Sequence, residues 1–214
     1  MKVLELFAGS RSIGKAAEEL GFEVFSSDIN AFEGIDYVVD LLDFDLTRLP
    51  WKPDIIWASP PCTSYSIAGI RHHRDGQYPK SDFAIKSDKM ILKVLNMIQE
   101  LKPSAYFIEN PRGMLRKMHF MQNLHRDTVT YCQYGDFRMK PTDIWHFSAW
   151  IPKPICKNGD PCHEASPRGQ TVRKLRAQGV DIKKGGTESL KNDYERSKIP
   201  HELCLEVLKS CVSK

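Results

Sequence analysis

The sequence lacks any apolar run approaching the roughly 18 residues that a membrane-spanning helix needs. Its opening residues, 1–7, read as a strand and lack the long apolar core of a secretory signal. Internal repeats are absent too, and 41% hydrophobic with 27% charged residues argues against disorder. We therefore expect a cytoplasmic, monomeric protein without a membrane partner, folded as one domain with an appendage.

A strong charge of one sign is also missing, since the formal net charge is only +4. The positive charge is nevertheless uneven. Residues 151–200 carry 11 Lys and Arg against 6 Asp and Glu, whereas the rest of the chain carries 20 against 21. Such a segment is typical of an appendage that faces phosphates, and a solvated surface is the alternative interpretation.

The cysteines are not expected to form disulfides, because a chain without an export signal stays reduced. They are candidates for packing, metal binding or catalysis. Three of the six, Cys132, Cys156 and Cys162, could join His163 in a tetrahedral zinc site. Their spacing differs from a CxxC knuckle, so reduced cysteines without a metal are the alternative. Cys204 and Cys211 lie seven apart on a predicted helix and are interpreted as core.

Apolar patterns predict short strands that alternate with helices. The predicted strands span residues 3–7, 22–27, 37–39, 54–58, 105–108, 127–132 and 144–147, and the predicted helices residues 13–20, 81–101 and 200–212. This order indicates a Rossmann-like α/β fold with a mostly parallel, doubly wound sheet. Residues 1–148 would form the main domain, 149–193 a small, irregular, basic segment, and 194–214 a C-terminal helix packed back on the main domain.

Ligands bind such sheets at the carboxyl ends of the strands, and the sequence places its main motifs there. Small residues in the turn after the first strand would let the backbone approach a ligand. Asp28 could accept hydrogen bonds from ribose hydroxyls, Ile29 could cover an adenine, and Asp40 could receive an exocyclic amine. Helix packing, capping or solvent exposure is the alternative for each feature alone. The turn consists of Phe7, Ala8, Gly9, Ser10, Arg11, Ser12, Ile13 and Gly14.

A reactive cysteine is indicated after the fourth predicted strand, in the run Ser59-Pro60-Pro61-Cys62. The two prolines fix the backbone directly after a buried strand and aim Cys62 into the crevice. A thiolate there would be a strong nucleophile, and an inert packing cysteine is the alternative. Glu109 ends the next strand and could act as a general acid or bind a base edge, with a structural salt bridge as its alternative.

Basic and imidazole residues gather in the segment 67–88 that follows the cysteine. They suit contact with phosphates, and a solvated charged loop is the alternative. A metal at the paired histidines is not favoured, because no cysteine is spaced nearby. These residues are Arg71, His72, His73, Arg74 and Lys80.

In this order the motifs resemble those of the cytosine-C5 DNA methyltransferases, and in detail the compact phage-type members. The resemblance runs from the first strand to the last helix and is strongest at Glu5-Leu6-Phe7-Ala8-Gly9, Pro61-Cys62 and Glu109-Asn110. It implies an enzyme of phage DNA modification or restriction–modification that methylates C5 of a flipped-out cytosine in DNA, using S-adenosylmethionine.

The resemblance also implies a role for each matching residue. Cys62 would add to cytosine C6 while Glu109 binds N3 and the amino group. Asn110, next to Glu109 in the same motif, is a further implied catalytic residue. The family's arginine pair, which supports the base, is represented here by Arg138, Lys140 and Thr142, and the motif leaves the assignment among the three open. The implied substrate contacts are Pro61, Ser66, Arg71, His72 and Arg74. The implied cofactor contacts are Phe7, Ala8, Gly9, Ser10, Arg11, Ser12, Ile13, Asp28, Ile29, Asp40, Pro60 and Ser197.

Several positions depart from the family pattern. Ser10-Arg11-Ser12 stands where the family has paired glycines, and Pro111 stands where valine is commoner. Arg196-Ser197 replaces the usual Gly-Asn. The segment 149–193 is short for a target-recognition region, because reading base edges needs several side chains in a groove. It therefore predicts relaxed specificity, for about one or two base pairs.

Two other functions fit parts of the pattern. Amino-methyltransferases acting on adenine N6 or cytosine N4 share a Pro-Pro motif, which Ser59-Pro60-Pro61 matches, but Cys62 stands where they need an aromatic residue. A catalytically silent DNA-binding relative would use the basic segment and would have no need of Cys62 and Glu109. A partner that supplies specificity is compatible with all three interpretations.

Overall fold

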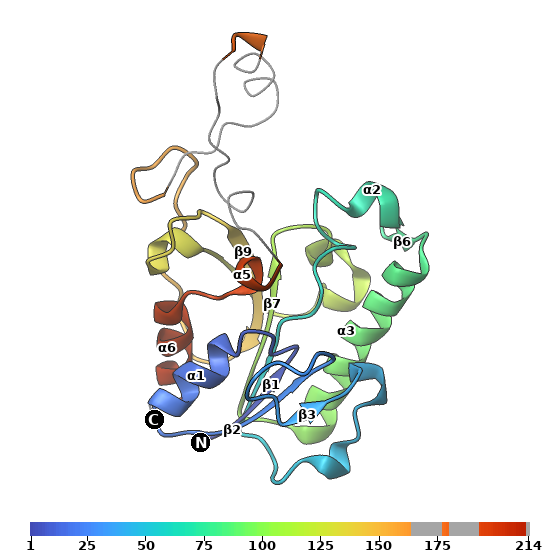
Figure 1. The fold of residues 1–214 in the computed structure, drawn as a ribbon, viewed down its shortest axis with the longest axis vertical. Helices are drawn as coiled ribbons and strands as arrows, with labels where there is room; N and C mark the ends of the chain where they lie inside the picture. The colour runs from blue at the N-terminus through green and yellow to red at the C-terminus, as the bar shows by residue number, and fades with distance from the viewer. Residues whose placement is uncertain (164–176, 180–192, 213–214) are drawn as a thin grey trace.

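Seven strands form one sheet in the computed structural model, which describes residues 1–163, 177–179 and 193–212. Their order is β3-β2-β1-β4-β7-β9-β8 (Figure 1). Neighbouring strands from β3 to β7 are parallel, and β9 runs antiparallel between β7 and β8. This confirms the predicted, mostly parallel α/β sheet. The strands are β1 (Lys2–Leu6), β2 (Glu23–Asp28), β3 (Tyr37–Val38), β4 (Ile55–Ala58), β7 (Ala105–Pro111), β8 (Arg126–Thr130) and β9 (Pro141–Phe147).

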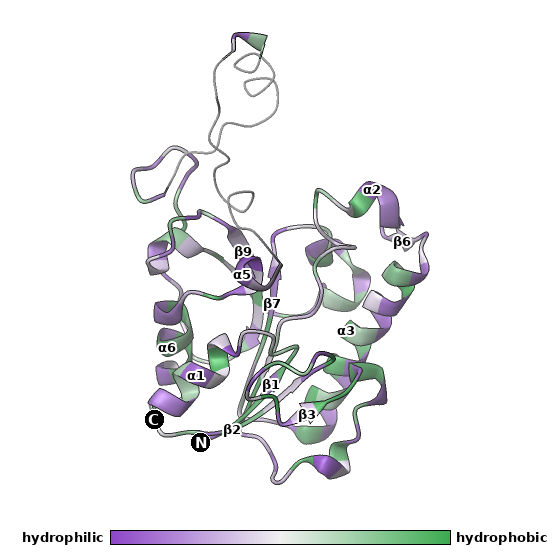
Figure 2. Cartoon of the chain, viewed as in Figure 1, coloured by the Kyte–Doolittle hydropathy of each residue, from purple (hydrophilic) through white to green (hydrophobic). Residues whose placement is uncertain are grey.

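Helices cover both faces of this sheet (Figure 1). α1 (Ser12–Glu19) and α6 (His201–Ser210) pack together on one face, and α3 (Asp82–Leu101) covers the other. Because side chains alternate along a strand, Val3 packs beneath α1 and α6 whereas Leu4 packs on the α3 side. Figure 2 shows largely apolar strands between helices of mixed polarity, as burial of both sheet faces requires.

The link from β3 to β4 differs from the predicted alternation of strands and helices. It forms only two short 3-10 helices, η1 (Leu41–Asp43) and η2 (Leu46–Arg48). The side chains of Asp40 and Asp45 cap them by accepting a hydrogen bond from the backbone N–H two residues on. Pro50 follows directly and cannot continue a helix. Three further 3-10 helices are η3 (Leu115–Lys117), η4 (His119–Met121) and η5 (Tyr131–Tyr134).

The chain after Cys62 is structured rather than an open loop. It forms the short helix α2 (Ile70–His73), followed by a hairpin of β5 (Arg74–Asp75) and β6 (Tyr78–Pro79). Figure 2 shows α2 as largely polar. Near the C-terminus, α5 (Asp193–Ser197) precedes α6. The predicted recognition segment 149–193 falls mostly outside the described residues, and in the described part of the chain no helix is long and apolar enough to cross a membrane.

Candidate active site

A cavity of about 580 Å³ lies at the carboxyl ends of the parallel strands β1, β4 and β7. Its size is within the roughly 300–1,000 Å³ of small-molecule sites, and its position is that of ligand sites in open α/β sheets. Loops from both ends of the chain build it. The predicted residues that line it are Phe7, Ala8, Ser10, Ser12, Pro60, Pro61, Cys62, Ser66, Glu109, Lys140 and Ser197.

Cys62 enters this cavity from the loop that follows β4. The backbone N–H groups of Tyr65 and Ser66 donate to the Cys62 carbonyl at 3.0 and 2.8 Å, so a helical turn begins at the cysteine. Just before it, the Pro60 carbonyl accepts a hydrogen bond from Nδ2 of Asn110 at 2.9 Å. Asn110 belongs to β7, so the prolines are tied to the sheet. Cys62 therefore stands on a turn that is held on both sides.

Glu109 is buried at the same cavity. Its Oε1 accepts a hydrogen bond from the Tyr131 hydroxyl at 3.0 Å, and the Ser59 side chain is a further partner. Burial raises the pKa of Glu109, against the opposing effect of the nearby Lys140 ammonium and of these hydrogen bonds. The carboxyl group consequently keeps its proton to a higher pH than an exposed glutamate.

Lys140 brings a positive charge to the cavity. Its Nζ donates to the Arg196 carbonyl at 3.0 Å and lies 4.5 Å from the centre of the Tyr131 ring. Burial lowers the pKa of Lys140, while attraction to Glu109 and Cys62 acts in the opposite direction. The residue has a φ of 29°, a conformation that survives in a non-glycine residue only where surrounding contacts hold it.

The turn after β1 meets the C-terminal segment at this cavity. Gly9 has a φ of 47°, and its N–H donates to Oδ2 of Asp28 at 2.9 Å. The Ile199 N–H donates to the Ser12 hydroxyl at 3.2 Å. A Cβ on Gly9 would stand 3.9 Å from Oγ of Ser197. The first and last predicted cofactor motifs, 187 residues apart at Ser12 and Ile199, are thus brought into contact.

Known proteins share these features. Residues 1–129 match the model of the C-5 cytosine-specific DNA methylases. The chain belongs to that family. It is 30% identical to the "Probable DNA (cytosine-5)-methyltransferase" of frog virus 3 (isolate Goorha), over 99% of this chain and 100% of that protein. It is also 29% identical to the type II methyltransferase M.CviJI of Paramecium bursaria Chlorella virus IL3A, over 70% of this chain but only 37% of that one.

A solved structure extends the likeness of fold to the whole methylase. A variant of Spodoptera frugiperda DNMT2 superposes with a TM-score of 0.60, covering 99% of each chain at 13% sequence identity. Identity this low speaks for the fold alone. Together with the family match, it shows that the sheet and its two helical layers are those of an S-adenosylmethionine-dependent methyltransferase.

One acid in the cavity of the methylase was not predicted as a site residue. Glu5 on β1 faces the start of α1, where its Oε1 accepts a hydrogen bond from the Ile13 N–H at 3.1 Å. Its Oε2 accepts one from the Ser26 hydroxyl at 3.0 Å. Burial raises the pKa of Glu5 to about 7. A Cβ on Gly14 would stand 2.7 Å from this carboxyl group, so Gly14 is needed for the close approach. The sequence did contain a signal for Glu5, namely an acidic residue inside a strand that is otherwise largely apolar.

Two predicted cofactor residues of the methylase have other partners. Arg11 pairs with Glu18 and donates to the Ser26 hydroxyl at 3.2 Å, and it does not line the cavity. Its φ of 54° is one that glycine adopts freely, which accounts for the glycines at this turn in the family pattern. Asp40 is paired with Lys86 at 2.5 Å, and that hydrogen bond lowers the pKa of Asp40.

Further predicted cofactor and support residues stand outside the cavity lining, among them Gly9 in the turn after β1. Ile13, on α1, is buried in the core, and Asn110 binds the loop before Cys62. Asp28 accepts a hydrogen bond from the Gly9 N–H, whereas Ile29 next to it is 60% exposed. These positions leave a polar group and an apolar surface beside the cavity at the end of β2.

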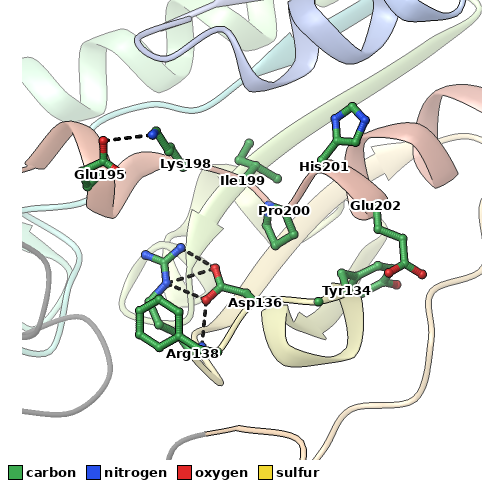
Figure 3. A pocket seen from close by; sticks show the side chains of 11 residues that line it. Tyr134, Asp136, Arg138, Glu195, Lys198, Ile199, Pro200, His201 and Glu202 are labelled. Atoms are coloured by element: carbon green, nitrogen blue, oxygen red, sulfur yellow. Dashed lines mark hydrogen bonds and ion pairs between the residues drawn. The ribbon is translucent and has the colours of Figure 1, made fainter.

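Arg138 and Lys140, which were both expected to support the base, line different cavities. Arg138 lies in a second cavity of about 410 Å³, where its guanidinium holds Asp136 (Figure 3). Nε of Arg138 donates to the two Asp136 oxygens at 2.9 and 3.0 Å, and Nη1 donates to the Arg196 carbonyl at 3.4 Å. Both basic residues therefore bind one carbonyl, but only Lys140 lines the cavity of Cys62.

Burial contradicts the predicted DNA contact of Arg74. The residue is 3% exposed, and its guanidinium pairs with Asp88 at 2.5 Å and donates to the Ser64 carbonyl at 3.0 Å. It also lies 4.3 Å from the centre of the Tyr65 ring. Arg74 thus fastens the hairpin after α2 to α3 and to the turn behind Cys62. On α2 itself, Arg71 and His72 are exposed.

The predicted metal ligands converge at a different place. The sulfur atoms of Cys132, Cys156 and Cys162 and Nδ1 of His163 belong to a group whose ligand atoms all lie within 4.8 Å of one another. None of the four lines the cavity of Cys62. The remaining two cysteines are packed as expected, with Cys204 on α6 buried in the core and Cys211, just after α6, partly buried against it.

Proposed function

We propose that this methylase transfers the methyl group of S-adenosylmethionine to C5 of a cytosine in DNA while Cys62 is bonded transiently to C6. The observation that carries the proposal is the shared cavity, because Cys62, Glu109 and Lys140 line the same space as the turn after β1. Addition to a pyrimidine ring needs a nucleophile, an acid and a stabilising charge within reach of one another.

The residues beside this cavity suit S-adenosylmethionine. Gly9 leaves room where the backbone turns, and Asp28 at the end of β2 can accept hydrogen bonds from ribose hydroxyls. Ile29 offers an exposed apolar surface for an adenine, and Ser197 adds a polar group from the C-terminal segment. When bound there, the cofactor supplies an electrophilic methyl group. These side chains would orient it toward the turn that carries Cys62.

The proposed reaction starts when the Cys62 thiolate attacks C6. A bond forms between Sγ and C6, and the electrons of the C5–C6 bond are stabilised by a proton that Glu109 delivers to N3. The raised pKa of Glu109 favours this role, because the carboxyl group keeps its proton to a higher pH than an exposed glutamate does. The Lys140 ammonium favours the thiolate before the attack.

Methyl transfer would then form a bond from C5 to the methyl carbon as the bond from that carbon to the cofactor's sulfur breaks, so that S-adenosylhomocysteine leaves and C5 becomes tetrahedral. Loss of the C5 proton to solvent and breakage of the bond between Sγ and C6 restore the aromatic ring, and Cys62 leaves as a thiolate. Glu109 recovers its proton as N3 gives it up. The protein therefore ends the cycle with both groups in their starting state, so no further reactant is needed.

A cytosine inside a duplex cannot reach this cavity, so we propose that it is flipped out. Arg71 and His72 on α2 are exposed near the loop of Cys62 and would contact the phosphates. Residues 149–193 would supply target recognition, with 1–148 and 194–214 forming the catalytic body. Bisulfite sequencing of DNA from expressing cells should show methylation in many contexts, and methylation confined to sites of four or more bases would reject relaxed specificity.

The direct test is transfer of label from tritiated S-adenosylmethionine to DNA, followed by nucleoside analysis. We expect 5-methylcytosine from the wild type and none from Cys62→Ser. Cys211→Ser is the matched control and should keep full activity, since this cysteine just after α6 does not line the cavity. Label in N4-methylcytosine or N6-methyladenine that persists in Cys62→Ser would show amino methylation instead.

A further inference from the structure

Four side chains of ligand type come together from two parts of the chain. Cys132 lies in η5, directly after β8, whereas Cys156, Cys162 and His163 follow β9. Sγ of Cys132 is 3.1 Å from Sγ of Cys156 and 3.6 Å from Sγ of Cys162. Nδ1 of His163 is 3.7 Å from Sγ of Cys156 and 3.5 Å from Sγ of Cys162. The four ligand atoms therefore surround one point.

These separations are those of a tetrahedral metal site. Zinc bonds of about 2.3 Å to sulfur and about 2.0–2.1 Å to nitrogen place ligand atoms roughly 3.5–3.8 Å apart around a tetrahedron. Three of the four measured distances fall near this range, and the shortest, between Cys132 and Cys156, would open when a cation separates the sulfurs. A disulfide is excluded in this arrangement because its sulfurs would be about 2.05 Å apart.

Backbone hydrogen bonds and a tight turn bring the ligands together. The Cys156 N–H donates to the Thr130 hydroxyl at 3.1 Å, which anchors the loop to the end of β8. A tight turn then runs from Lys157 to Asp160, whose N–H donates to the Lys157 carbonyl at 3.1 Å. Gly159 permits this turn with a φ of 101°. The loop thus returns Cys162 and His163 to the two buried sulfurs.

One contact of His163 would change on metal binding. The Gly159 N–H donates to Nε2 of His163 at 3.4 Å. When Nδ1 binds a metal, Nε2 carries the proton and cannot accept, so this long contact would be given up. The exchange loses one weak hydrogen bond and gains a metal bond.

We propose that Cys132, Cys156, Cys162 and His163 bind one zinc ion. Three thiolates and an imidazole favour zinc over hard cations such as magnesium or calcium, which prefer oxygen ligands. All four coordination positions are filled by protein, so the ion is structural and takes no part in methyl transfer. This site is separate from the cavity of Cys62, and the inference does not depend on the proposed reaction.

The site joins two functional parts of the chain. Cys156, Cys162 and His163 belong to the basic segment 149–193 that is expected to recognise DNA, so the ion would fix the first part of that segment to the end of β8. On the other side, Cys132 is adjacent to Tyr131, whose hydroxyl binds Glu109. The metal would therefore anchor the base of the recognition segment and stiffen the 3-10 turn that positions Tyr131.

Metal analysis of the full-length chain tests the proposal. Protein purified without chelator and dialysed against buffer free of metal should contain one zinc ion per chain by elemental mass spectrometry. Cys156→Ser and Cys162→Ser should each lower the zinc content or affinity at least about tenfold. Cys211→Ser serves as the control and should retain the ion, because this cysteine packs against the core just after α6.

Cobalt titration of chelator-treated wild type provides a second readout that needs no variant to fold. Saturation at one equivalent, with thiolate-to-cobalt charge transfer and the intense visible bands of tetrahedral cobalt, supports the proposal. Weak octahedral bands or the absence of a saturable signal would overturn it. It would equally be overturned by zinc content that is unchanged in Cys156→Ser and Cys162→Ser, or by a disulfide among these cysteines in the purified protein.

Discussion

The Tyr131 hydroxyl donates a hydrogen bond to Oε1 of Glu109 at 3.0 Å, and both side chains are buried. The bond holds the carboxyl group in one orientation at the edge of the cavity. It also stabilises the carboxylate form, so it lowers the pKa of a group whose pKa burial raises. Tyr131 therefore sets both the position and the acidity of the proposed acid.

Replacing Tyr131 by Phe should raise the pKa of Glu109 further, since the carboxylate loses a donor. If protonated Glu109 is the active acid, methylation declines as pH rises through its pKa. The alkaline limb of the rate profile should therefore move to higher pH. Tyr134→Phe is the control, because that hydroxyl contacts Glu206 instead. An alkaline limb that does not move in Tyr131→Phe would contradict the role of Glu109 as acid.

Glu109→Gln tests proton delivery separately from binding. An amide can still donate to N3 and accept from the amino group of cytosine, but it cannot deliver a proton. We expect the turnover rate to fall by about 10²–10⁴ while DNA affinity changes little. Equilibrium binding with a fluorescent duplex and single-turnover kinetics would measure the two effects. A variant that lost affinity and kept its turnover rate would assign Glu109 to binding alone.

Glu5 should make the stability of the fold depend on pH. Its pKa is about 7 in the folded chain, against an ordinary value of 4.5, so the folded state holds an extra proton between these values. The part of the folding stability that depends on protonated Glu5 is fully present below about pH 4.5 and is lost as the pH rises through about 7.

Relative to wild type, Glu5→Gln should therefore become more stable as pH rises across this window, by at most about 3 kcal/mol. Chemical denaturation at pH 5 and pH 8 would measure the difference. Glu23→Gln, at an exposed position on β2, supplies the baseline. An equal difference from wild type at both pH values would show that Glu5 does not titrate in this range.

Arg74 and Arg71 should separate stability from DNA contact. Arg74→Ala leaves Asp88 without its buried partner and should cost about 3 kcal/mol of unfolding free energy. Arg71→Ala should leave stability unchanged but weaken DNA binding and reduce the salt dependence of the binding constant by about one ion. Thermal unfolding and salt titrations would measure these effects. The reverse pattern, with Arg74 controlling the salt slope, would contradict the burial argument.

Features that depend on local sequence could be predicted. The sheet followed from apolar strands separated by turns, and the loop of Cys62 followed from two prolines after a buried strand. The candidate metal ligands could be chosen by residue type. That they lie close together could not be predicted, because it depends on how the loop after β9 packs against the end of β8. In each case the chemistry of a few neighbouring residues constrained the structure.

Features that depend on distant contacts could not be predicted. Arg74 belongs to a row of basic residues, and only the packing of α3 against the turn of Tyr65 shows that it is buried. Arg138 and Lys140 are two positions apart and both donate to the Arg196 carbonyl, yet they line different cavities. The place of Glu5 in the cavity could not be predicted for the same reason, because its hydrogen-bond partners lie at the start of α1 and on β2.

The central claim is that Cys62 bonds to C6 of the target cytosine, and trapping on DNA that contains 5-fluorocytosine tests it most directly. Fluorine at C5 cannot leave as a proton does, so the enzyme stays bonded to the base after methyl transfer. With S-adenosylmethionine present, the wild type should form a stable complex that mass spectrometry maps to Cys62, and Cys62→Ser should form none. A wild type that binds DNA and cofactor but forms no adduct, or a variant that still forms one, would contradict the account.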